Sequence, residues 1–550
     1  MSRLPLPQLT FDNEFFWTSG SDGTLRIQEC GDCKSLIHPP QPVCRYCYSH
    51  NMGVREVSGR AVLSAFTVNH RFSIPGLPAP YVVAQVAIEE DPRVRLTTNI
   101  VECDPDELEL GRLVEVVFEH NDDVWLPLFR PTAEPEVGAL PEDEIAPQDF
   151  GRFVRPMLTP KKFEDAAAIT GIGASRLGRR LMVVPLSLTI AACEAAIADA
   201  GLTLADIDGL STYPAMDVMG MGEGGVTALE GALGIRPTWI NGGMELPGQG
   251  GAVIAAMLAI ASGLCRHVLC WRTVWESTAA TLRLGSGAGG GGRISGPLLE
   301  WRAPFGAMSA ANWIAMHASH YFHRYGATRE MLGWIALNGR ANAARNPAAI
   351  YRDPMTMDDY LSARPISSPF GLFDCDIPCD ASVAVVVSDA SVAGDLPKPA
   401  IRVEAVGTQI TERVSWDQDT LTHEPQVIGQ SEHLWTRTSL RPADCDLALV
   451  YDGFTFNAIS WIEALGFCGF GEATDWLDGG RRIALDGDLP VNPHGGQLSE
   501  GRTHGFGFIY EAMVQLRHEA GERQVAGAHT AVVTSGGGTP SSVLLLQRDA

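Results

Sequence analysis

The sequence predicts an α/β protein in which a small, cysteine-containing all-β segment precedes a much larger layered body. Three observations support this fold class. Four cysteines form two closely spaced pairs near the start, short β-branched segments fill residues 56–130, and alternating strand and helix patterns run from about residue 165 to the end. At 550 residues the chain exceeds one compact core, so two or three domains are expected.

The composition is that of a folded protein with an acidic surface. Apolar residues make up 45% and charged residues 19%, which excludes disorder over most of the chain. Lys and Arg number 41 against 65 Asp and Glu, giving a net charge of −24. Such a chain repels phosphate backbones and anionic lipid, so we expect neither nucleic acid nor a membrane as a partner. A local basic pocket for an anionic small ligand is compatible with this balance.

No segment has the pattern of an export signal or a membrane span. The start, MSRLPLPQLTFDNEFFW, lacks the long apolar run of a signal peptide. The most apolar stretch, residues 251–265, is too short to cross a bilayer, so a buried helix is expected there. Apart from the two pairs, the cysteines are scattered among apolar residues, as buried thiols often are. We therefore expect a cytoplasmic protein.

The most specific local motif is CxxC-x10-CxxC. Each CxxC turn presents two thiolates to one ion, and two such turns make the tetrahedral four-sulfur site that Zn²⁺ prefers. Disulfides or a redox dithiol are the alternatives, and the expected cytosolic location and the missing thioredoxin-like context disfavour them. With cysteine at all four positions the metal is expected to be structural. The predicted ligands are Cys30, Cys33, Cys44 and Cys47.

The remaining patterns divide the chain. Short strands are expected at 62–68, 81–88, 94–101 and 113–118, typical of a small barrel, and an acidic, proline-rich stretch without periodicity follows. In the body, a helix over 186–200 lies between strands at 168–172 and 207–213. The expected division is 1–55 for an N-terminal helix and zinc ribbon, 56–130 for the barrel, 131–161 for a linker and 162–550 for the body.

Two family resemblances follow from these motifs. The order of helix, four-cysteine ribbon and barrel over about residues 10–130 resembles the zinc-ribbon plus OB-fold proteins that accompany thiolase-like enzymes of acyl-CoA metabolism. The body resembles the thiolase superfamily, most closely its sterol-carrier-protein-x and lipid-transfer-protein branch. The matching text includes FDCDIPCDASVAVVVSDA at 373–390, YDGFT at 451–455 and NPHGGQLSEGRTHGFGF at 492–508. This resemblance implies two similar halves stacked as αβαβα layers, and a homodimer.

The catalytic positions of a thiolase are nevertheless changed. Claisen chemistry needs a nucleophilic Cys, a His that activates it and a second Cys that moves a proton. The region matching the first Cys, MELPGQG at 244–250, contains none. The His position holds Arg502, with His504 two residues later, and the second Cys is matched by Thr534 or Ser535. Acyl transfer through cysteine is therefore disfavoured.

Tyr451 indicates a different reaction. It matches the family's catalytic-water Asn, and the resembling sterol side-chain aldolases lack the Cys pair and use tyrosine. The resemblance implies retro-aldol cleavage of a β-hydroxyacyl-CoA with a steroid or other bulky acyl group, giving a ketone or aldehyde and a short acyl-CoA. Tyr451 is expected to act as base or proton relay, His504 to assist it, Arg502 to bind the enolate oxygen or a CoA phosphate, and Asp452 to fix the loop.

Other residues of the matching loops are candidates for binding the substrate, whose CoA part is the only expected cofactor besides zinc. They are Asn492, His494, Gly496 and the oxyanion-hole glycines Gly536, Gly537 and Gly538. Two other functions stay open: a thiolase-type acyltransferase with an unusual nucleophile, and a non-catalytic acyl-CoA or lipid carrier. The barrel could bind CoA, close the site, or dock a hydratase or dehydrogenase of the same pathway.

Overall fold

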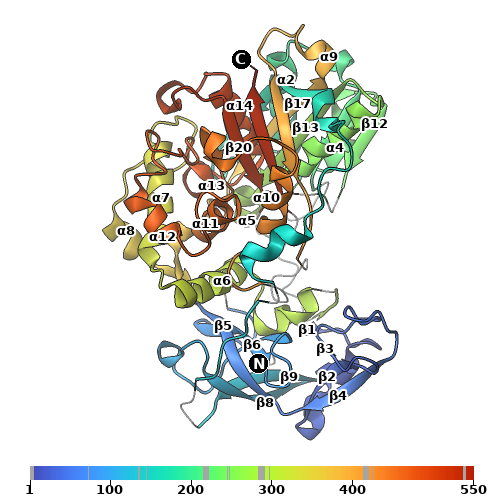
Figure 1. Ribbon diagram of the computed structural model, residues 1–550, viewed down its shortest axis with the longest axis vertical. Coiled ribbons are helices and arrows are strands. Elements are labelled where there is room, and N and C mark those ends of the chain that lie inside the picture. Colours follow the sequence, from blue (N-terminus) through green and yellow to red (C-terminus); the bar gives the residue numbers. More distant parts are fainter. Residues whose placement is uncertain are drawn as a thin grey trace.

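The computed structural model describes residues 5–71, 73–133, 137–143, 145–214, 222–243, 246, 248–282, 292–296, 298–412, 420–424, 426–536 and 541–549. A smaller N-terminal part lies at one end of the larger body, and the C-terminus lies at the opposite end (Figure 1). Within these ranges, no helix is both long enough and apolar enough to cross a bilayer.

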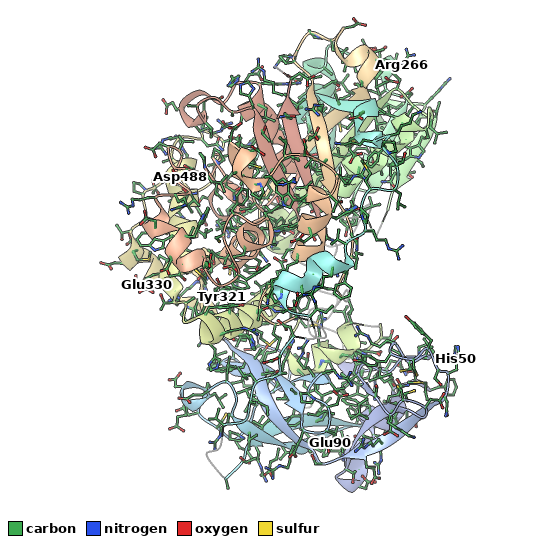
Figure 2. All side chains as sticks on the ribbon, viewed as in Figure 1. His50, Glu90, Arg266, Tyr321, Glu330 and Asp488 are labelled. Atoms are coloured by element: carbon green, nitrogen blue, oxygen red, sulfur yellow. The ribbon has the colours of Figure 1, made fainter. Side chains whose placement is uncertain are left out.

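The first unit is a three-stranded antiparallel sheet. Strand β2 (Leu25–Cys30) lies between β3 (Leu36–Ile37) and β4 (Met52–Val57), and helix α1 (Glu14–Trp17) contacts β2. His50, at the outer edge of the N-terminal part in Figure 2, lies two residues before β4. The sheet places both cysteine pairs in the loops at one end, as the ribbon prediction requires.

A five-stranded barrel follows. It consists of β5 (Arg60–Asn69), β6 (Tyr81–Ile88), β7 (Arg95–Thr98), β8 (Leu113–Asn121) and β9 (Val124–Pro131). β5 pairs with both β6 and β8, and a bridge from Ile100 to Phe129 closes the ring between the β7 and β9 sides. The four predicted strands are present. The fifth strand, β9, was not predicted, because a proline at 127 argues against a strand. In the structure, β9 accommodates Pro127 beside the edge where the barrel closes.

The body joins the barrel through both backbone and side chains. Strand β15 (Pro365–Ser367) pairs with β5 through Ser367 and Asn69, which extends the barrel sheet. Helix α6 (Ala310–Tyr325), which carries the Tyr321 labelled in Figure 2, packs along β5. Trp17 stacks on Trp301 with ring centroids 5.0 Å apart. The two parts therefore share a buried apolar junction.

A nine-stranded sheet forms the centre of the body. Its order is β12 (Trp239–Gly242), β11 (Gly209–Thr212), β13 (His267–Trp275), β17 (Asp380–Asp389), β10 (Ala167–Ala174), β18 (Ile401–Gly407), β21 (Ser542–Arg548), β20 (Thr530–Ser535) and β19 (Leu447–Leu449). Its halves meet where Ala168 and Ile169 of β10 pair with β18. Outward from this junction, the first half runs β10, β17, β13 and β11, and the second half runs β18, β21, β20 and β19. In each half these are the first, the last, the last but one and the second strand in chain order. This repeat confirms two similar halves.

Helices form three layers around the two half-sheets. The core between them contains α4 (Gly250–Ala261) and α14 (Phe506–Leu516), with Val383, Val385 and Val387 of β17 facing it. The alternate residues of β17 face α2 (Pro185–Asp199) and α3 (Gly225–Leu233). The outer face of the second half is covered by α10 (Val427–Trp435), α11 (Thr455–Ala464) and α7 (Arg329–Ala343). The predicted αβαβα layering is confirmed.

The predicted helix over 186–200 corresponds to α2, and Gly201 follows it with φ +70°, the left-handed conformation that ends a helix. The apolar stretch 251–265 was predicted as one buried helix, and this prediction was too long. Helix α4 ends at Ala261, and Leu264 in the following turn is exposed.

Candidate active site

Tyr451 lies directly beyond the C-terminal end of β19. Its backbone N–H donates to Oγ1 of Thr534 at the end of β20, 2.7 Å away, and its half-buried ring packs near Phe508 of α14. Burial and the negative charge of Asp376 raise the pKa of the Tyr451 hydroxyl above its usual range. The phenol is therefore protonated near neutral pH and can donate a hydrogen bond or a proton.

Arg502 lies between two carboxylates. Its Nε donates to Oε2 of Glu276 at 2.7 Å, its Nη2 donates to the same oxygen, and its Nη1 donates to Oδ1 of Asp376 at 2.9 Å. These charges raise the pKa of Arg502 despite its burial. Glu276 begins helix α5 (Glu276–Thr281), and Asp376 lies in the loop before β17. The site thus contains a partly buried carboxylate–guanidinium–carboxylate cluster, in which the Arg502 side chain is 27% exposed.

His504 is held as a neutral imidazole beside this cluster. Its Nδ1 lies 2.9 Å from Nη2 of the buried Arg272, and its Nε2 lies 3.8 Å from Oε1 of Glu276. Because a guanidinium can only donate, Nδ1 is the acceptor and Nε2 carries the hydrogen. Burial, Arg272 and Arg502 hold the pKa of His504 well below its usual 6.5. The side chain can donate from Nε2 but has no free ring nitrogen to act as a base.

Sequence reasoning missed Arg272, Glu276 and Asp376. Each left a signal in the sequence. Arg272 is a charged residue within the apolar run HVLCWRTVW, and Glu276 directly follows that run. Asp376 lies inside the family-like FDCDIPCD text. A charge in a strand with two covered faces needs a buried partner, and this rule would have pointed to the site.

Asp452 and Gly496 fix the loop around Tyr451. Oδ1 of Asp452 accepts a hydrogen bond from the backbone N–H of Gln497 at 2.8 Å, at the start of α13 (Gly496–Ser499). Gly496 has φ +63°, and a Cβ there would lie 1.9 Å from Oδ2 of Asp452. Burial raises the pKa of Asp452 to about 7. Asp452 and Gly496 therefore allow the loop after Tyr451 and the start of α13 to lie close together.

Asn492 and His494 lie behind the same loop. The side-chain amide of Asn492 both accepts from and donates to the backbone of Val450, at 2.9 Å each. His494 packs on Phe508, and its Nε2 lies 3.6 Å from Oε2 of Glu500. Burial lowers the pKa of His494 to about 3, so its ring is neutral. Gly536 is described, with φ +85°, whereas the predicted oxyanion-hole residues Gly537 and Gly538 lie outside the described residues.

The region that matches the nucleophilic cysteine of a thiolase contains no cysteine, and its contact with the end of β20 is made by a backbone N–H. The N–H of Gly250, at the start of α4, donates to Oγ of Ser535 at 2.9 Å. Met244, Glu245 and Pro247 lie outside the described residues. The nearest cysteines in sequence are both buried in the core, and burial raises the pKa of Cys265 to about 12 and that of Cys270 well above its usual value. These two thiols are core residues, as expected.

The four ribbon cysteines form a compact sulfur cluster. All four sulfurs lie within 4.8 Å of one another, with Cys30 and Cys47 at 3.6 Å and Cys33 and Cys44 at 3.5 Å. A tetrahedral site with Zn–S bonds of about 2.3 Å has sulfur separations of about 3.8 Å. Left-handed residues follow each pair at the same position, Lys34 with φ +65° and Tyr48 with φ +60°. The donor set and its spacing fit structural zinc.

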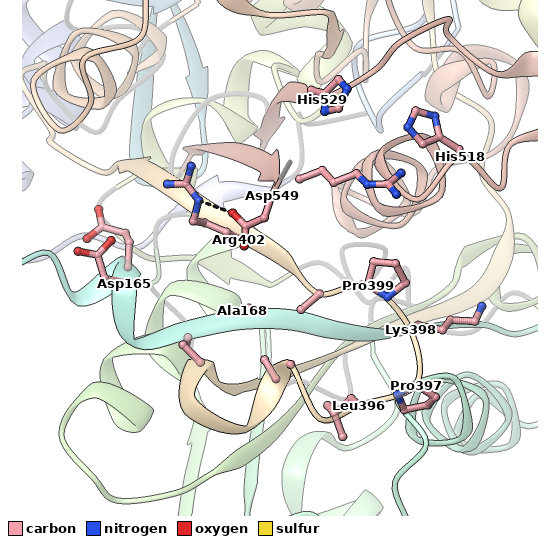
Figure 3. Close-up of a pocket in the computed structure, with 17 residues that line it drawn as sticks. Asp165, Ala168, Leu396, Pro397, Lys398, Pro399, Arg402, His518, His529 and Asp549 are labelled. Atoms are coloured by element: carbon pink, nitrogen blue, oxygen red, sulfur yellow. Dashed lines mark ion pairs between the residues drawn. The ribbon is translucent and has the colours of Figure 1, made fainter.

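A separate cavity of about 860 Å³ lies at the opposite end of β20, where His529 precedes the strand (Figure 3). Two of its basic residues are already paired: Arg402 with Asp549 at 3.3 Å, as drawn in Figure 3, and Lys398 with Asp199 at 2.7 Å. This cavity is remote from Tyr451 and contains none of the predicted catalytic residues. It is not the site of the chemistry argued from the sequence.

Comparison with known proteins agrees with both parts of the chain. Residues 17–53 match the family described as ChsH2, rubredoxin-like zinc ribbon domain, and residues 54–119 match the ChsH2, C-terminal OB-fold domain. Residues 408–547 match the Thiolase C-terminal domain-like family. The fold and the site therefore define a thiolase-fold protein that carries a zinc ribbon and an OB-fold barrel on the same chain.

Individual relatives narrow the family further. The chain is 35% identical over 392 residues to a steroid side-chain-cleaving aldolase of Thermomonospora curvata, covering 70% of this chain and 98% of the relative. It is 35% identical over 399 residues to 17-hydroxy-3-oxo-4-pregnene-20-carboxyl-CoA lyase of Mycobacterium tuberculosis, covering 69% and 98%. The solved structure of an Ltp2-ChsH2(DUF35) aldolase aligns with a TM-score of 0.62 at 33% identity, over 70% of this chain and 98% of that one. The chain belongs to this aldolase family of the thiolase superfamily.

Proposed function

We propose that this protein is a carbon–carbon lyase that cleaves a β-hydroxyacyl-CoA by a retro-aldol reaction. The products are a ketone or aldehyde and a shorter acyl-CoA, and the acyl group is a steroid side chain or another bulky group, as in the names of the two relatives. The observation that carries the proposal is the protonated Tyr451 beside the Arg502 cluster, at a site without a described cysteine nucleophile.

The residues divide the work as follows. Retro-aldol cleavage creates a thioester enolate, so hydrogen-bond donors must face its oxygen and an acid must protonate its carbon. The Tyr451 hydroxyl supplies a proton donor, and the Nε2 hydrogen of His504 and the N–H of Gly536 are donors for the enolate oxygen. The charge of Arg502 is balanced by Glu276 and Asp376, and its role is to hold these two carboxylates in place. Asp452, Asn492, His494 and Gly496 hold the loop that positions Tyr451.

The experiment compares the wild-type protein with Tyr451→Phe on a steroid β-hydroxyacyl-CoA, following carbonyl product and short acyl-CoA by mass spectrometry. We expect cleavage by the wild type and a loss of about 10²–10⁴-fold in kcat for the variant, the range of general acid–base catalysis. A wild-type protein that binds the CoA ester without cleaving it favours a carrier. Thioester exchange with free CoA favours an acyltransferase.

A homodimer is part of the proposal. Strand β12 lies at the edge of the nine-stranded sheet, and such an edge is a template for pairing with another chain. Ile240 of β12 is 55% exposed, and exposed Leu264 lies beside Thr238, two residues before Ile240, since the Leu264 carbonyl accepts from the Thr238 hydroxyl at 2.7 Å. Pairing of two copies along β12 would cover these apolar side chains.

Three further features belong to the proposal. The matches at 17–53 and 54–119 support the domain limits expected from the sequence. A hydratase that adds water to an enoyl-CoA makes a β-hydroxyacyl-CoA, so it is the natural supplier of substrate, and a dehydrogenase or reductase could remove the carbonyl product. A cytoplasmic location accords with twelve cysteines that form no disulfide.

A further inference from the structure

We propose that Asp376 is the general base of this site, that it takes the proton of the substrate's β-hydroxyl group, and that Arg502 and Glu276 are the residues that position it. This inference rests on the proposed retro-aldol function and names the proton acceptor that the reaction requires.

The backbone ties Asp376 to both catalytic loops. Its N–H donates to the carbonyl of Gly453 at 3.0 Å, two residues beyond Tyr451, and Cys375 forms a β-bridge with Phe454. On the other side, the N–H of Arg502 donates to the carbonyl of Ile377 at 3.0 Å. The Asp376 carboxylate therefore keeps a fixed place relative to the tyrosine loop and the arginine loop.

The side chain has one oxygen engaged and one left for a substrate. Oδ1 accepts from Nη1 of Arg502, whereas Oδ2 makes no hydrogen bond to any residue that the structure describes. The side chain is 7% exposed, so it is enclosed but not sealed. Because Arg502 fixes one carboxylate oxygen, the direction of the other oxygen is fixed as well, as a carboxylate base requires.

The other titratable groups of the cluster are unsuited to take this proton. The Tyr451 hydroxyl is protonated, and the only acceptor nitrogen of His504 is occupied by Arg272. Oε2 of Glu276 accepts two hydrogen bonds from Arg502, and its Oε1 lies 3.8 Å from the hydrogen-bearing Nε2 of His504. Of the two carboxylates that hold Arg502, Asp376 is the less engaged, because it accepts one hydrogen bond from the arginine whereas Glu276 accepts two.

The electrostatic surroundings suit the role. Burial, together with the charge of Glu276, raises the pKa of Asp376 to about 7, and Arg502 offsets part of this rise. A base with a pKa near the working pH is present in both forms and can accept and return a proton. The titratable groups that interact with it are Arg502, Glu276, Tyr451, Asp452, Cys375 and Cys379.

The step balances without a further reactant. Oδ2 of Asp376 takes the β-hydroxyl proton, the β carbon–oxygen bond becomes a carbonyl, and the bond between Cα and Cβ breaks. Its electron pair passes into the thioester as an enolate. The proton then moves from Asp376 through the Tyr451 hydroxyl to Cα, which gives the shorter acyl-CoA and regenerates the carboxylate.

The test uses the full chain with Asp376→Asn, Asp376→Glu and, as a control, Asp488→Asn, an exposed carboxylate at the edge of the body (Figure 2). The measurement is kcat and kcat/KM for cleavage of the steroid β-hydroxyacyl-CoA from pH 5 to 9. We expect the wild-type rate to fall below about pH 7 as Asp376 protonates. Asp376→Asn should lose about 10²–10⁴-fold in kcat, with KM within threefold, and should lose this acidic limb. Asp376→Glu should recover part of the rate, and Asp488→Asn should match the wild type.

A second variant covers the case in which Asp376→Asn does not fold. Glu276→Gln removes the negative charge that raises the Asp376 pKa, so the acidic limb should move to lower pH. An unmoved limb would overturn the proposal, as would an Asp376→Asn protein that folds and keeps kcat within threefold. In either case, cleavage of the substrate by the wild-type protein would still support the aldolase function. A wild type that cleaves no β-hydroxyacyl-CoA would instead overturn the proposed function itself.

Discussion

Nη2 of Arg272 lies 2.9 Å from Nδ1 of His504, and both side chains are buried. Arg272 comes from the middle of β13, whereas His504 begins the turn into α14 with φ +51°. This contact joins the two halves of the body at the site. It also fixes the tautomer of the histidine, because Arg272 offers only donors.

The first prediction concerns the protonation of His504. The folded-state pKa lies well below 6.5, so below pH 6.5 the unfolded chain gains a proton that the folded chain does not. The free energy of unfolding should therefore fall with decreasing pH, with a contribution from this residue of up to about 1.4 kcal/mol per pH unit. Denaturant titrations of wild type and His504→Gln between pH 5 and 8 should show a shallower acid slope in the variant. Parallel curves would show that His504 is not held neutral by folding.

The second prediction concerns Gly496. A Cβ there meets Oδ2 of Asp452 at 1.9 Å and the backbone has φ +63°, so Gly496→Ala must displace the loop or α13. We expect a loss of about 2–4 kcal/mol in the free energy of unfolding, and a loss of activity as Tyr451 moves. The control is Gly231→Ala in α3, where a Cβ meets nothing within 4 Å. It should be neutral or stabilising by about 0.5–1 kcal/mol. Equal effects at the two positions would contradict the packing argument.

The third prediction concerns the metal. Purified wild-type protein should contain close to one zinc per chain by elemental mass spectrometry, and Cys44→Ala should contain far less, because three thiolates leave the site incomplete. Cys103→Ala, a partly buried cysteine outside the cluster, should keep the wild-type content. Since metal binding and ribbon folding are coupled, chelation should also expose the N-terminal segment to proteases. Full zinc content in Cys44→Ala would rule out the four-sulfur site.

The fourth prediction concerns assembly. Light scattering after size exclusion should give twice the chain mass of 59.1 kDa. Ile240→Asp places a charge at the β12 edge and should shift the protein toward the monomer. Val54→Asp, an equally drastic change at an exposed position of the ribbon, should leave the mass unchanged. A dimer that persists in Ile240→Asp would place the interface on another surface.

Much of the scaffold could be predicted because its signals are local. Short β-branched and apolar runs predicted the barrel strands, 3.6-residue periodicity predicted α2, and the two CxxC pairs predicted the ribbon. β9 was missed because Pro127 obscures its pattern. The helix beginning at Gly250 was drawn too long because its apolar run continues past Ala261 into a turn.

The candidate site was only partly predictable. Tyr451, Arg502 and His504 lie in family-like text, and the structure brings them to one end of the sheet. Asn492 stays a predicted substrate-binding residue, and only the structure showed that its amide bonds the backbone of Val450. The sequence could point to Asp376 and Glu276 as charges beside apolar text, but it could not assign their roles, because a carboxylate becomes a candidate base only when its partner is known.

The sequence by itself determined the α/β class, the zinc ribbon, the absence of cysteine from residues 244–250 and the tyrosine at 451, since each depends on residue type and short spacing, and the family resemblance implied the αβαβα stacking. Only the tertiary structure decided which charges meet. Glu276 and Arg502 are 226 residues apart in the chain, and both are brought together by the segment before β17, where their backbone N–H groups donate to the carbonyls of Cys379 and Ile377. The energy of a buried ion pair depends on distance and desolvation, and neither can be read along a chain.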